Sequence, residues 1–188
     1  NGQLDSVYAG SYQPKAYYGA NIALNYKSFD LSIGGYGTMG GKIYNGKKAF
    51  RQSLLDNIEA STATNQWTNA NHSQTEPRAN GGNLPASTYY IESGSYFRIN
   101  NINIGYTLPE AILQKTRVIT RLRVYVAAQN PFTFTKYSGF TPELQPPTPT
   151  SASLTNAPPS GSSPTSAGIE LNAYPTVRTI SLGVNIGF

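Results

Sequence analysis

Apolar and small polar residues alternate along five stretches of the chain. The clearest stretch is Val177 to Phe188, where residues 180, 182, 184, 186 and 188 are apolar and the residues between them are Ser, Gly or Asn. Successive side chains of a strand point to opposite faces, so this stretch predicts a ribbon with one apolar and one polar face. Its length suits a tilted transmembrane strand of about 9 to 11 residues, but a strand of a soluble β-sandwich would alternate as well.

The same alternation predicts four strands upstream. They run over residues 18–26, 29–34, 95–108 and 121–129. Lys27 and Ser28 leave room only for a tight turn, so the first two strands predict a hairpin. Tyr26 and Phe29 flank this turn, as an aromatic girdle would at a membrane interface, although in a soluble protein they would be cross-strand partners.

The alternation changes phase within the strand at 95–108. Its apolar positions are odd-numbered before Asn100 and Asn101 and even-numbered after them. We therefore predict a β-bulge at these two residues, or an upper segment that faces protein rather than lipid.

The connections between the strands are of two lengths. Residues 26–29 and 108–121 are short links, and the latter opens with a helical turn predicted over 109–115. Residues 41–94 and 135–176 are long loops. In an up-and-down meander the short links fall on one side and the long loops on the other, as in bacterial outer-membrane barrels, which have short periplasmic turns and long extracellular loops. The carboxy terminus is then periplasmic.

The long loops differ in composition. Phe50, Leu54 and Ile58 recur at four-residue spacing, which predicts a short amphipathic helix over 46–60. Residues 62–87 are rich in Asn, Thr, Ser and Gly, and residues 142–166 are mostly Pro, Ser and Thr, a composition that does not form a core.

Composition supports an architecture with a small core. Apolar residues make up 38% of the chain, below the roughly 45–50% of a typical globular domain. The formal charge is +5, but the Lys and Arg residues are scattered, which favours a solvated face or anionic lipid head groups over nucleic acid. The chain has no Cys, and it begins at Asn1 without a Met or signal peptide, so we expect a processed or partial chain.

The sequence offers little for catalysis. Its nine carboxylates form no paired motif, and His72 has no second His, Cys or carboxylate close in sequence. We therefore predict no catalytic, metal or cofactor site and take His72 as a solvated loop residue. Trp67 either stacks on a sugar ring or packs its own loop, and Tyr89 and Tyr90 are further candidate substrate contacts in that loop.

The two strand faces receive different roles if the strands span a membrane. The apolar set would face lipid, where a charge costs about 2–4 kcal/mol near the midplane. The polar set would line a lumen or contact a plug. Arg121, Arg123 and Arg178, with Tyr125, are candidates for holding plug carboxylates; the alternative is that the arginines are hydrated lumen side chains.

The order of several short motifs also resembles a known family. These motifs are YKSFDLS (26–32), GKIYNG (41–46), ESGSYFRINNI (92–102), GYTLP (105–109), AQNPFTFTKYSGF (128–140) and YPTVRT (174–179). Together they resemble the carboxy-terminal end of the SusC/RagA family of TonB-dependent outer-membrane transporters of Bacteroidota. The resemblance runs from about Lys15 to Phe188, with 142–166 outside the pattern.

The resemblance implies an all-β fold in which residues 1–188 form the last five strands of a large plugged barrel of about 22 strands. Such a barrel imports glycans, oligosaccharides or peptides, with a SusD-like surface lipoprotein as its lid and TonB as its energy source. Phe188 resembles the terminal aromatic residue of the signal read by the barrel-assembly machinery.

Five strands cannot close such a barrel, so the resemblance requires the remainder of the barrel, in the same chain or another, and contacts with lipid and lipopolysaccharide. The plug and TonB box do not occur in these residues. A soluble glycan-binding β-sandwich and a passive porin are the alternative functions.

Overall fold

We analysed a computed structural model of the chain, which describes residues 6–50, 58–78, 87–114, 118–144, 167–170 and 173–188. The chain divides into two compact units, each described here by itself. The strand unit comprises Pro14–Gly40, Ser95–Lys136 and Pro175–Phe188. The loop unit comprises Asn1–Gln13, Gly41–Gly94 and Tyr137–Tyr174.

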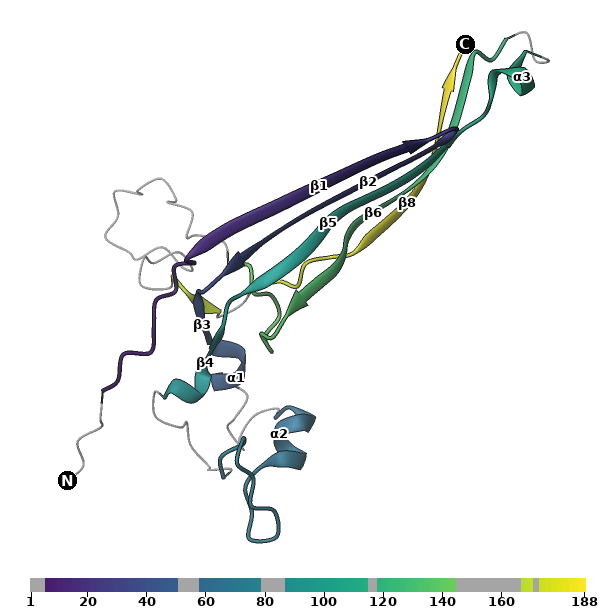
Figure 1. The fold of residues 1–188 in the computed structure, drawn as a ribbon. Coiled ribbons are helices and arrows are strands. Elements are labelled where there is room, and N and C mark those ends of the chain that lie inside the picture. The colour runs from purple at the N-terminus through teal and green to yellow at the C-terminus, as the bar shows by residue number, and fades with distance from the viewer. Residues whose placement is uncertain (1–5, 51–57, 79–86, 115–117, 145–166, 171–172) are drawn as a thin grey trace, which may run out of the picture. The chain divides into compact units, whose positions relative to one another are not determined.

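The strand unit is a single antiparallel sheet of five long strands (Figure 1). These strands are β1 (Ala16–Tyr26), β2 (Phe29–Met39), β5 (Tyr96–Thr107), β6 (Arg121–Thr135) and β8 (Thr179–Gly187). Their order in the sheet is β1-β2-β5-β6-β8, so each pairs with the next long strand of the sequence. The predicted up-and-down meander of five strands is confirmed.

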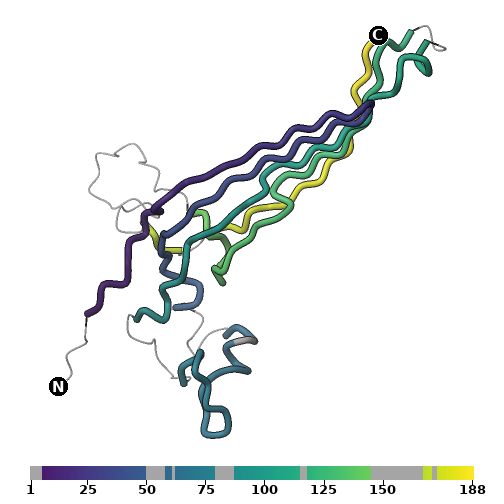
Figure 2. Tube along the Cα trace, in the orientation of Figure 1, coloured from purple at the N-terminus to yellow at the C-terminus, as the bar shows by residue number. Residues whose placement is uncertain are grey.

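The short connections lie at one end of this sheet, as predicted. The β1–β2 turn, the link with α3 (Glu110–Leu113) and the carboxy terminus lie together there, as the Cα trace also shows (Figure 2). Lys27 adopts a φ of 53°, which the two-residue turn between β1 and β2 requires. Pro109 is the N-cap residue of α3, in agreement with the predicted helical turn; residues 115–117 lie outside the described ranges.

The predicted bulge occurs at Asn100. The β2–β5 register shifts between Gly34 and Gly35, and the β5–β6 register shifts between Ile99 and Asn101. Because Asn100 is an extra residue in β5, the odd-numbered apolar positions before it, such as Ile99, lie on the same face as the even-numbered ones after it, such as Ile102. The neighbouring stretch of β6 contains Asn130, which has a φ of 48°, followed by Pro131. Proline has no N–H to donate, so its position at this irregularity of the strand pairing does not cost a ladder hydrogen bond.

The alternation that predicts strand β2 is clearest over 29–34, and the strand itself ends just before the long loop predicted from residue 41. It continues to Met39 through Gly35 and Gly37, which carry no β-strand signal of their own. The rings of Tyr18 and Phe97 stack with centroids 5.9 Å apart, and a Cβ on Gly37, which pairs with both residues, would meet the Tyr18 ring. Tertiary packing therefore places glycine where propensity alone predicts a loop.

The loop unit contains a second sheet that the sequence did not predict. Its strands are β3 (Lys42–Asn45), β4 (Ile91–Ser93) and β7 (Ile169–Glu170), in the order β4-β3-β7, and β3 pairs with β7 in parallel. The short helices are α1 (Gly46–Phe50), α2 (Ala60–Asn65) and η1 (Thr88–Tyr90). The segments 41–94 and 135–176 were predicted as two separate loops, but their described parts share this sheet.

The predicted helix over 46–60 is only partly correct. Helix α1 covers its start, but Ile58 and Glu59 are not helical, and α2 begins at Ala60. Residues 51–57, which include Leu54, lie outside the described ranges. In the described part of the chain no helix is long and apolar enough to cross a membrane.

Candidate functional site: the two sheet faces and a loop pocket

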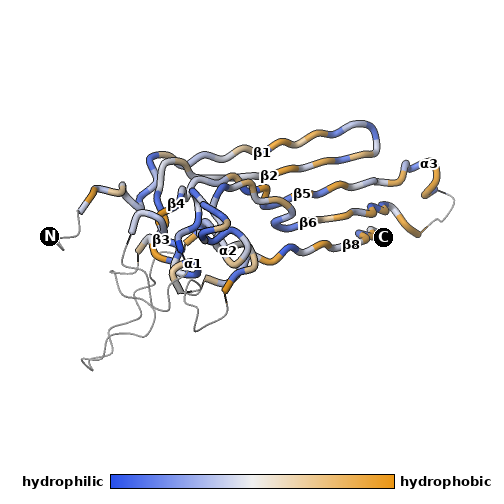
Figure 3. The backbone as a smooth tube through the Cα atoms, turned by 90° about the horizontal axis from the view of Figure 1, so that it is seen from below, coloured by the Kyte–Doolittle hydropathy of each residue, from blue (hydrophilic) through white to orange (hydrophobic). Residues whose placement is uncertain are grey.

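Cross-strand register gathers the aliphatic residues of the strand unit on one face, called here the apolar face. One row across the sheet contains Ile22, Ile33, Ile102, Ala128 and Ile180. The next contains Leu24, Leu31, Ile104, Val126 and Leu182. Figure 3 shows the alternation of hydropathy along the strands that produces these rows. The predicted lipid-facing set therefore shares a single face.

The apolar face is exposed even at the centre of the sheet. Ile104, on the middle strand β5, is 51% exposed, and Val126, on β6, is 44% exposed. Exposure reaches 75% at Leu182 on the edge strand β8. Contiguous exposed apolar surface of this kind marks a contact with lipid or with another protein.

Aromatic rings border the aliphatic rows at both ends. At the turn end Phe29 lies against Tyr106, with ring centroids 4.7 Å apart, and Tyr26 is the strand partner of Phe29. At the other end Tyr18 stacks on Phe97. Aromatic girdles on either side of an aliphatic band are typical of transmembrane barrels, so the arrangement extends the predicted girdle from one rim to two.

The opposite face of the strand unit is polar and carries an ion pair that spans three strands. Arg123 on β6 donates from Nε to Asp30 Oδ1 on β2 at 2.9 Å and from Nη2 to Asp30 Oδ2 at 2.5 Å. The guanidinium crosses β5 above Gly105, where a side chain would clash with both partners. Asn103 accepts a further hydrogen bond from Arg123 at 3.1 Å. The two-residue alternation is consistent with Asp30 on this face, but it does not reveal the pair.

The structure places the three predicted lumen arginines in different surroundings. Arg123 is paired within the sheet and lies 4.9 Å from the ring centroid of Tyr125. Arg121 lines the polar hollow at the turn end, with Lys27 and Asp30. The guanidinium of Arg178 lies 5.7 Å from the ring centroid of Phe132, which shares the apolar face of Ile99. Contact between these arginines and a plug stays a prediction.

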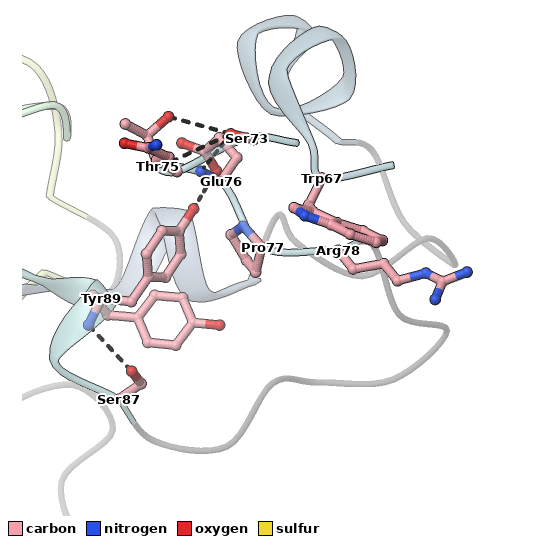
Figure 4. Close-up of a pocket in the computed structure, with 10 residues that line it drawn as sticks. Trp67, Ser73, Thr75, Glu76, Pro77, Arg78, Ser87 and Tyr89 are labelled. Atoms are coloured by element: carbon pink, nitrogen blue, oxygen red, sulfur yellow. Dashed lines mark hydrogen bonds between the residues drawn. The ribbon is translucent and has the colours of Figure 1, made fainter. Parts of the chain in front are cut away.

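The loop unit contains a pocket of about 500 Å³ that brings together Trp67, Tyr89 and Tyr90, the three predicted substrate contacts (Figure 4). Its remaining lining comes from residues 73–78 and Ser87. The pocket wall is held by local hydrogen bonds: Ser87 Oγ accepts from the Tyr89 N–H at 3.2 Å, and Ser73 Oγ accepts from the Glu76 N–H at 3.0 Å.

The aromatic rings of the pocket already have partners within the loop unit. Trp67 stacks on His72 with ring centroids 5.5 Å apart, and the Arg78 guanidinium lies 5.6 Å from the indole. His72 is an exposed loop residue, as predicted, and its ring also packs on Trp67. These contacts favour the interpretation that Trp67 packs its own loop.

Charge within the pocket is partly neutralised. The Tyr89 hydroxyl donates to Glu76, and Lys48 lies 3.7 Å from the Tyr89 ring centroid and 4.0 Å from Glu76 Oε1. Tyr90 is only 1% exposed, and its burial raises the pKa of its hydroxyl. Tyr90 therefore contributes a neutral wall.

Two carboxylates missed by the sequence analysis anchor the segment 137–140 to the small sheet. Glu170, 1% exposed, accepts hydrogen bonds from the Tyr137 hydroxyl and from the Phe140 N–H at 3.0 Å. Glu92 accepts from the Ser138 N–H at 2.8 Å and from Asn45 Nδ2 at 3.0 Å. Burial and the neighbouring Glu170 carboxylate raise the pKa of Tyr137, which keeps its hydroxyl a donor. The sequence signal for this anchor was that Glu92 and Ser138 both lie within motifs that resemble the family, at 92–102 and 128–140.

Comparison with known proteins agrees with this geometry. The chain is 34% identical over 191 residues to TonB-dependent receptor P3 of Formosa agariphila and 26% identical over 196 residues to TonB-dependent receptor SusC of Bacteroides thetaiotaomicron. Each match covers the whole chain but only 18% and 17% of the relative, respectively. No protein-family model matches the chain.

Over its whole length the chain is similar to a segment of SusC/RagA-type TonB-dependent receptors, and it spans less than a fifth of the relatives that it matches. Its fold agrees: the structure of the RagAB peptide transporter superposes with a TM-score of 0.72 at 23% identity, covering 95% of this chain and 18% of that one. The fold is therefore an all-β barrel fragment. TonB-dependent receptors are outer-membrane proteins, and the relatives compared here are receptors and a transporter rather than enzymes.

Proposed function

We propose that the chain forms the carboxy-terminal wall of an active importer in the bacterial outer membrane, which takes up glycans, oligosaccharides or peptides with energy from TonB. In this proposal a SusD-like lipoprotein covers the extracellular side as a lid, the loop unit contacts it, and the carboxy terminus lies in the periplasm. Phe188 acts as the terminal aromatic residue of the barrel-assembly signal.

The observation that carries the proposal is the apolar face with its two aromatic rims. An aliphatic band exposed on the central strands is unfavourable in water, where each Å² of buried apolar surface is worth about 25 cal/mol, but it matches a hydrocarbon layer. A soluble glycan-binding sandwich would instead bury this face against a second sheet. Within the strand unit, as far as the structure describes it, there is no second sheet to cover this face.

The sheet edges support a larger barrel. Strands β1 and β8 each pair on one side only within the described residues. Unpaired backbone groups are not tolerated in the hydrocarbon layer, so further strands must pair with both edges. The relatives are about six times as long as this chain and have room for those strands.

Uptake by whole cells tests the proposal and separates it from a passive porin. Cells that express the full-length receptor would be offered fluorescent oligosaccharides and oligopeptides, in the wild type and in a strain without TonB. We expect at least one class to enter only when both the receptor and TonB are present. Uptake that needs the receptor but persists without TonB would establish a porin.

Labelling tests the orientation separately. The chain has no Cys, so single cysteines at Thr75 in the loop unit and at Lys27 in the β1–β2 turn are unambiguous within it. A membrane-impermeant maleimide should label intact cells at position 75 but not at position 27. Labelling of position 27 alone would reverse the proposed orientation.

A further inference from the structure

Arg78, which lines the loop pocket, has no carboxylate partner among the residues that the structure describes, and its charge indicates the chemistry of a ligand. Lys47 pairs with Glu59 at 2.7 Å, and Lys48 lies 4.0 Å from Glu76. Arg78 has no carboxylate within ion-pair distance among the described residues. Within the described ranges, Lys47 and Lys48 are therefore compensated and Arg78 is not.

The position of Arg78 suits binding rather than simple solvation. Its side chain lies along the indole of Trp67, and its guanidinium extends beyond the ring at the rim of the pocket (Figure 4). Contact of the Arg78 side chain with the indole limits its rotamers, and the exposed guanidinium beyond the ring keeps its in-plane N–H donors available. An arginine held in this way offers a planar fork of donors, the geometry that a carboxylate matches with two hydrogen bonds.

The other residues that line the pocket determine which further groups of a ligand can bind beside its carboxylate. Glu76 is the only carboxylate among the described residues that line the pocket. Its carboxylate accepts a hydrogen bond from the Tyr89 hydroxyl and lies 4.0 Å from Lys48 Nζ. Pro77, Trp67 and Tyr90 supply apolar wall. A ligand that places a carboxylate on Arg78 and an apolar or ring-shaped stem in the pocket therefore meets little opposing charge.

We propose that this pocket binds a carboxylate-bearing ligand through Arg78, with the indole of Trp67 fixing the guanidinium. The proposal rests on the proposed import function and specifies its substrate class. The shared chemistry is one carboxylate next to a compact ring or apolar group. A uronic acid residue of an acidic oligosaccharide and the carboxy terminus of a peptide both supply it.

Matched probe pairs test this on the full-length receptor purified in detergent. One pair is hexagalacturonate and its methyl-esterified, neutral counterpart. The other is an apolar pentapeptide with a free carboxy terminus and the same peptide as its amide. Isothermal titration calorimetry should show that the acidic member of at least one pair binds about tenfold to a hundredfold more tightly, as expected for charge-assisted hydrogen bonds. The preferred pair identifies the source of the carboxylate.

Variants then assign the preference to Arg78. Arg78→Gln should remove it, and Arg78→Lys should retain part of it, because the charge remains but the planar fork is lost. Lys42→Gln is the matched control, since Lys42 is an exposed cation of the same unit outside the pocket lining. Heat-modifiable migration in gel electrophoresis would verify that each variant barrel is folded.

Several results would overturn the proposal: no preference in either pair, a preference that survives Arg78→Gln, or an equal loss in Lys42→Gln. Because the binding is measured without TonB, these results are independent of the uptake experiment. A TonB-dependent importer with no role for Arg78 would retain the proposed function and lose only this inference.

Discussion

The two units of the chain differ in which side chains they expose and which they bury, although both are built from apolar and charged residues. The strand unit exposes its aliphatic side chains, such as Leu182 at 75%, and pairs its charges Asp30 and Arg123 on the other face. The loop unit buries apolar groups such as Ile43, 4% exposed, together with the carboxylate of Glu170. The first pattern is stable against lipid, and the second is that of a small water-soluble core.

The difference shows what each unit depends on for stability. The strand unit needs a hydrocarbon environment and neighbouring strands, because its own packing leaves the apolar face uncovered. The loop unit has few buried apolar side chains and instead uses buried hydrogen bonds, which are costly when one partner is lost. We therefore expect the two units to respond to different substitutions.

The largest expected effect is from a charge on the apolar face. Leu182→Arg should cost about 2–4 kcal/mol near the membrane midplane and reduce the amount of folded receptor in the outer membrane. Ser181→Arg is the matched control, because Ser181 is the adjacent residue on the polar face. Outer-membrane abundance, measured by immunoblot of separated membranes, should fall only for Leu182→Arg. Equal loss in both variants would remove the distinction between the faces.

A smaller effect is expected from the buried anchor of the loop unit. Glu170→Ala removes the acceptor for the Tyr137 hydroxyl and the Phe140 N–H, which should cost about 1–3 kcal/mol of local stability. Hydrogen–deuterium exchange of residues 137–140 in the full-length receptor should then accelerate about 5- to 150-fold. Exchange in β8 should not change.

Glu110→Ala, at an exposed position of α3, is the control for this substitution. If exchange rose equally in β8 after Glu170→Ala, the loop unit would not be an independent element of stability.

The smallest effect is expected from the ion pair on the polar face. Asp30 and Arg123 retain 33% and 15% of their side-chain exposure, so solvent screens the pair and its coupling should be small even with two hydrogen bonds. A double-mutant cycle with Asp30→Asn and Arg123→Gln, read from thermal unfolding of the full-length receptor, measures it. A coupling near zero would make the pair incidental to the fold.

The alternation of side chains made the strand unit predictable, because face and register follow from a two-residue period. The bulge at Asn100 was predictable from the same period. The loop unit was not, because β3 and β7 are short, lie far apart in the sequence and pair through tertiary contacts. The continuation of β2 through Gly35 and Gly37, up to the loop predicted from residue 41, has a tertiary cause: rings from the neighbouring strands fill the space above glycine.

The sequence predicted the aromatic residues of the pocket but not its charged residues. Trp67, Tyr89 and Tyr90 stood out as aromatic residues in a polar loop, and the fold brings them together. Arg78 and Glu76 did not stand out, because a single charged residue in a polar stretch carries no pattern. Their roles depend on which charges find partners, and only the folded chain shows this.

The most direct test of the account is a cysteine scan along β8, from position 179 to 187, in the full-length receptor reconstituted into lipid bilayers. A fluorophore on each cysteine would be exposed in turn to a lipid-confined quencher and to a water-soluble one. The account predicts a two-residue period, with lipid quenching strong at 180, 182, 184 and 186 and weak at 181, 183 and 185. Uniform access to the water-soluble quencher, or the opposite phase, would contradict it.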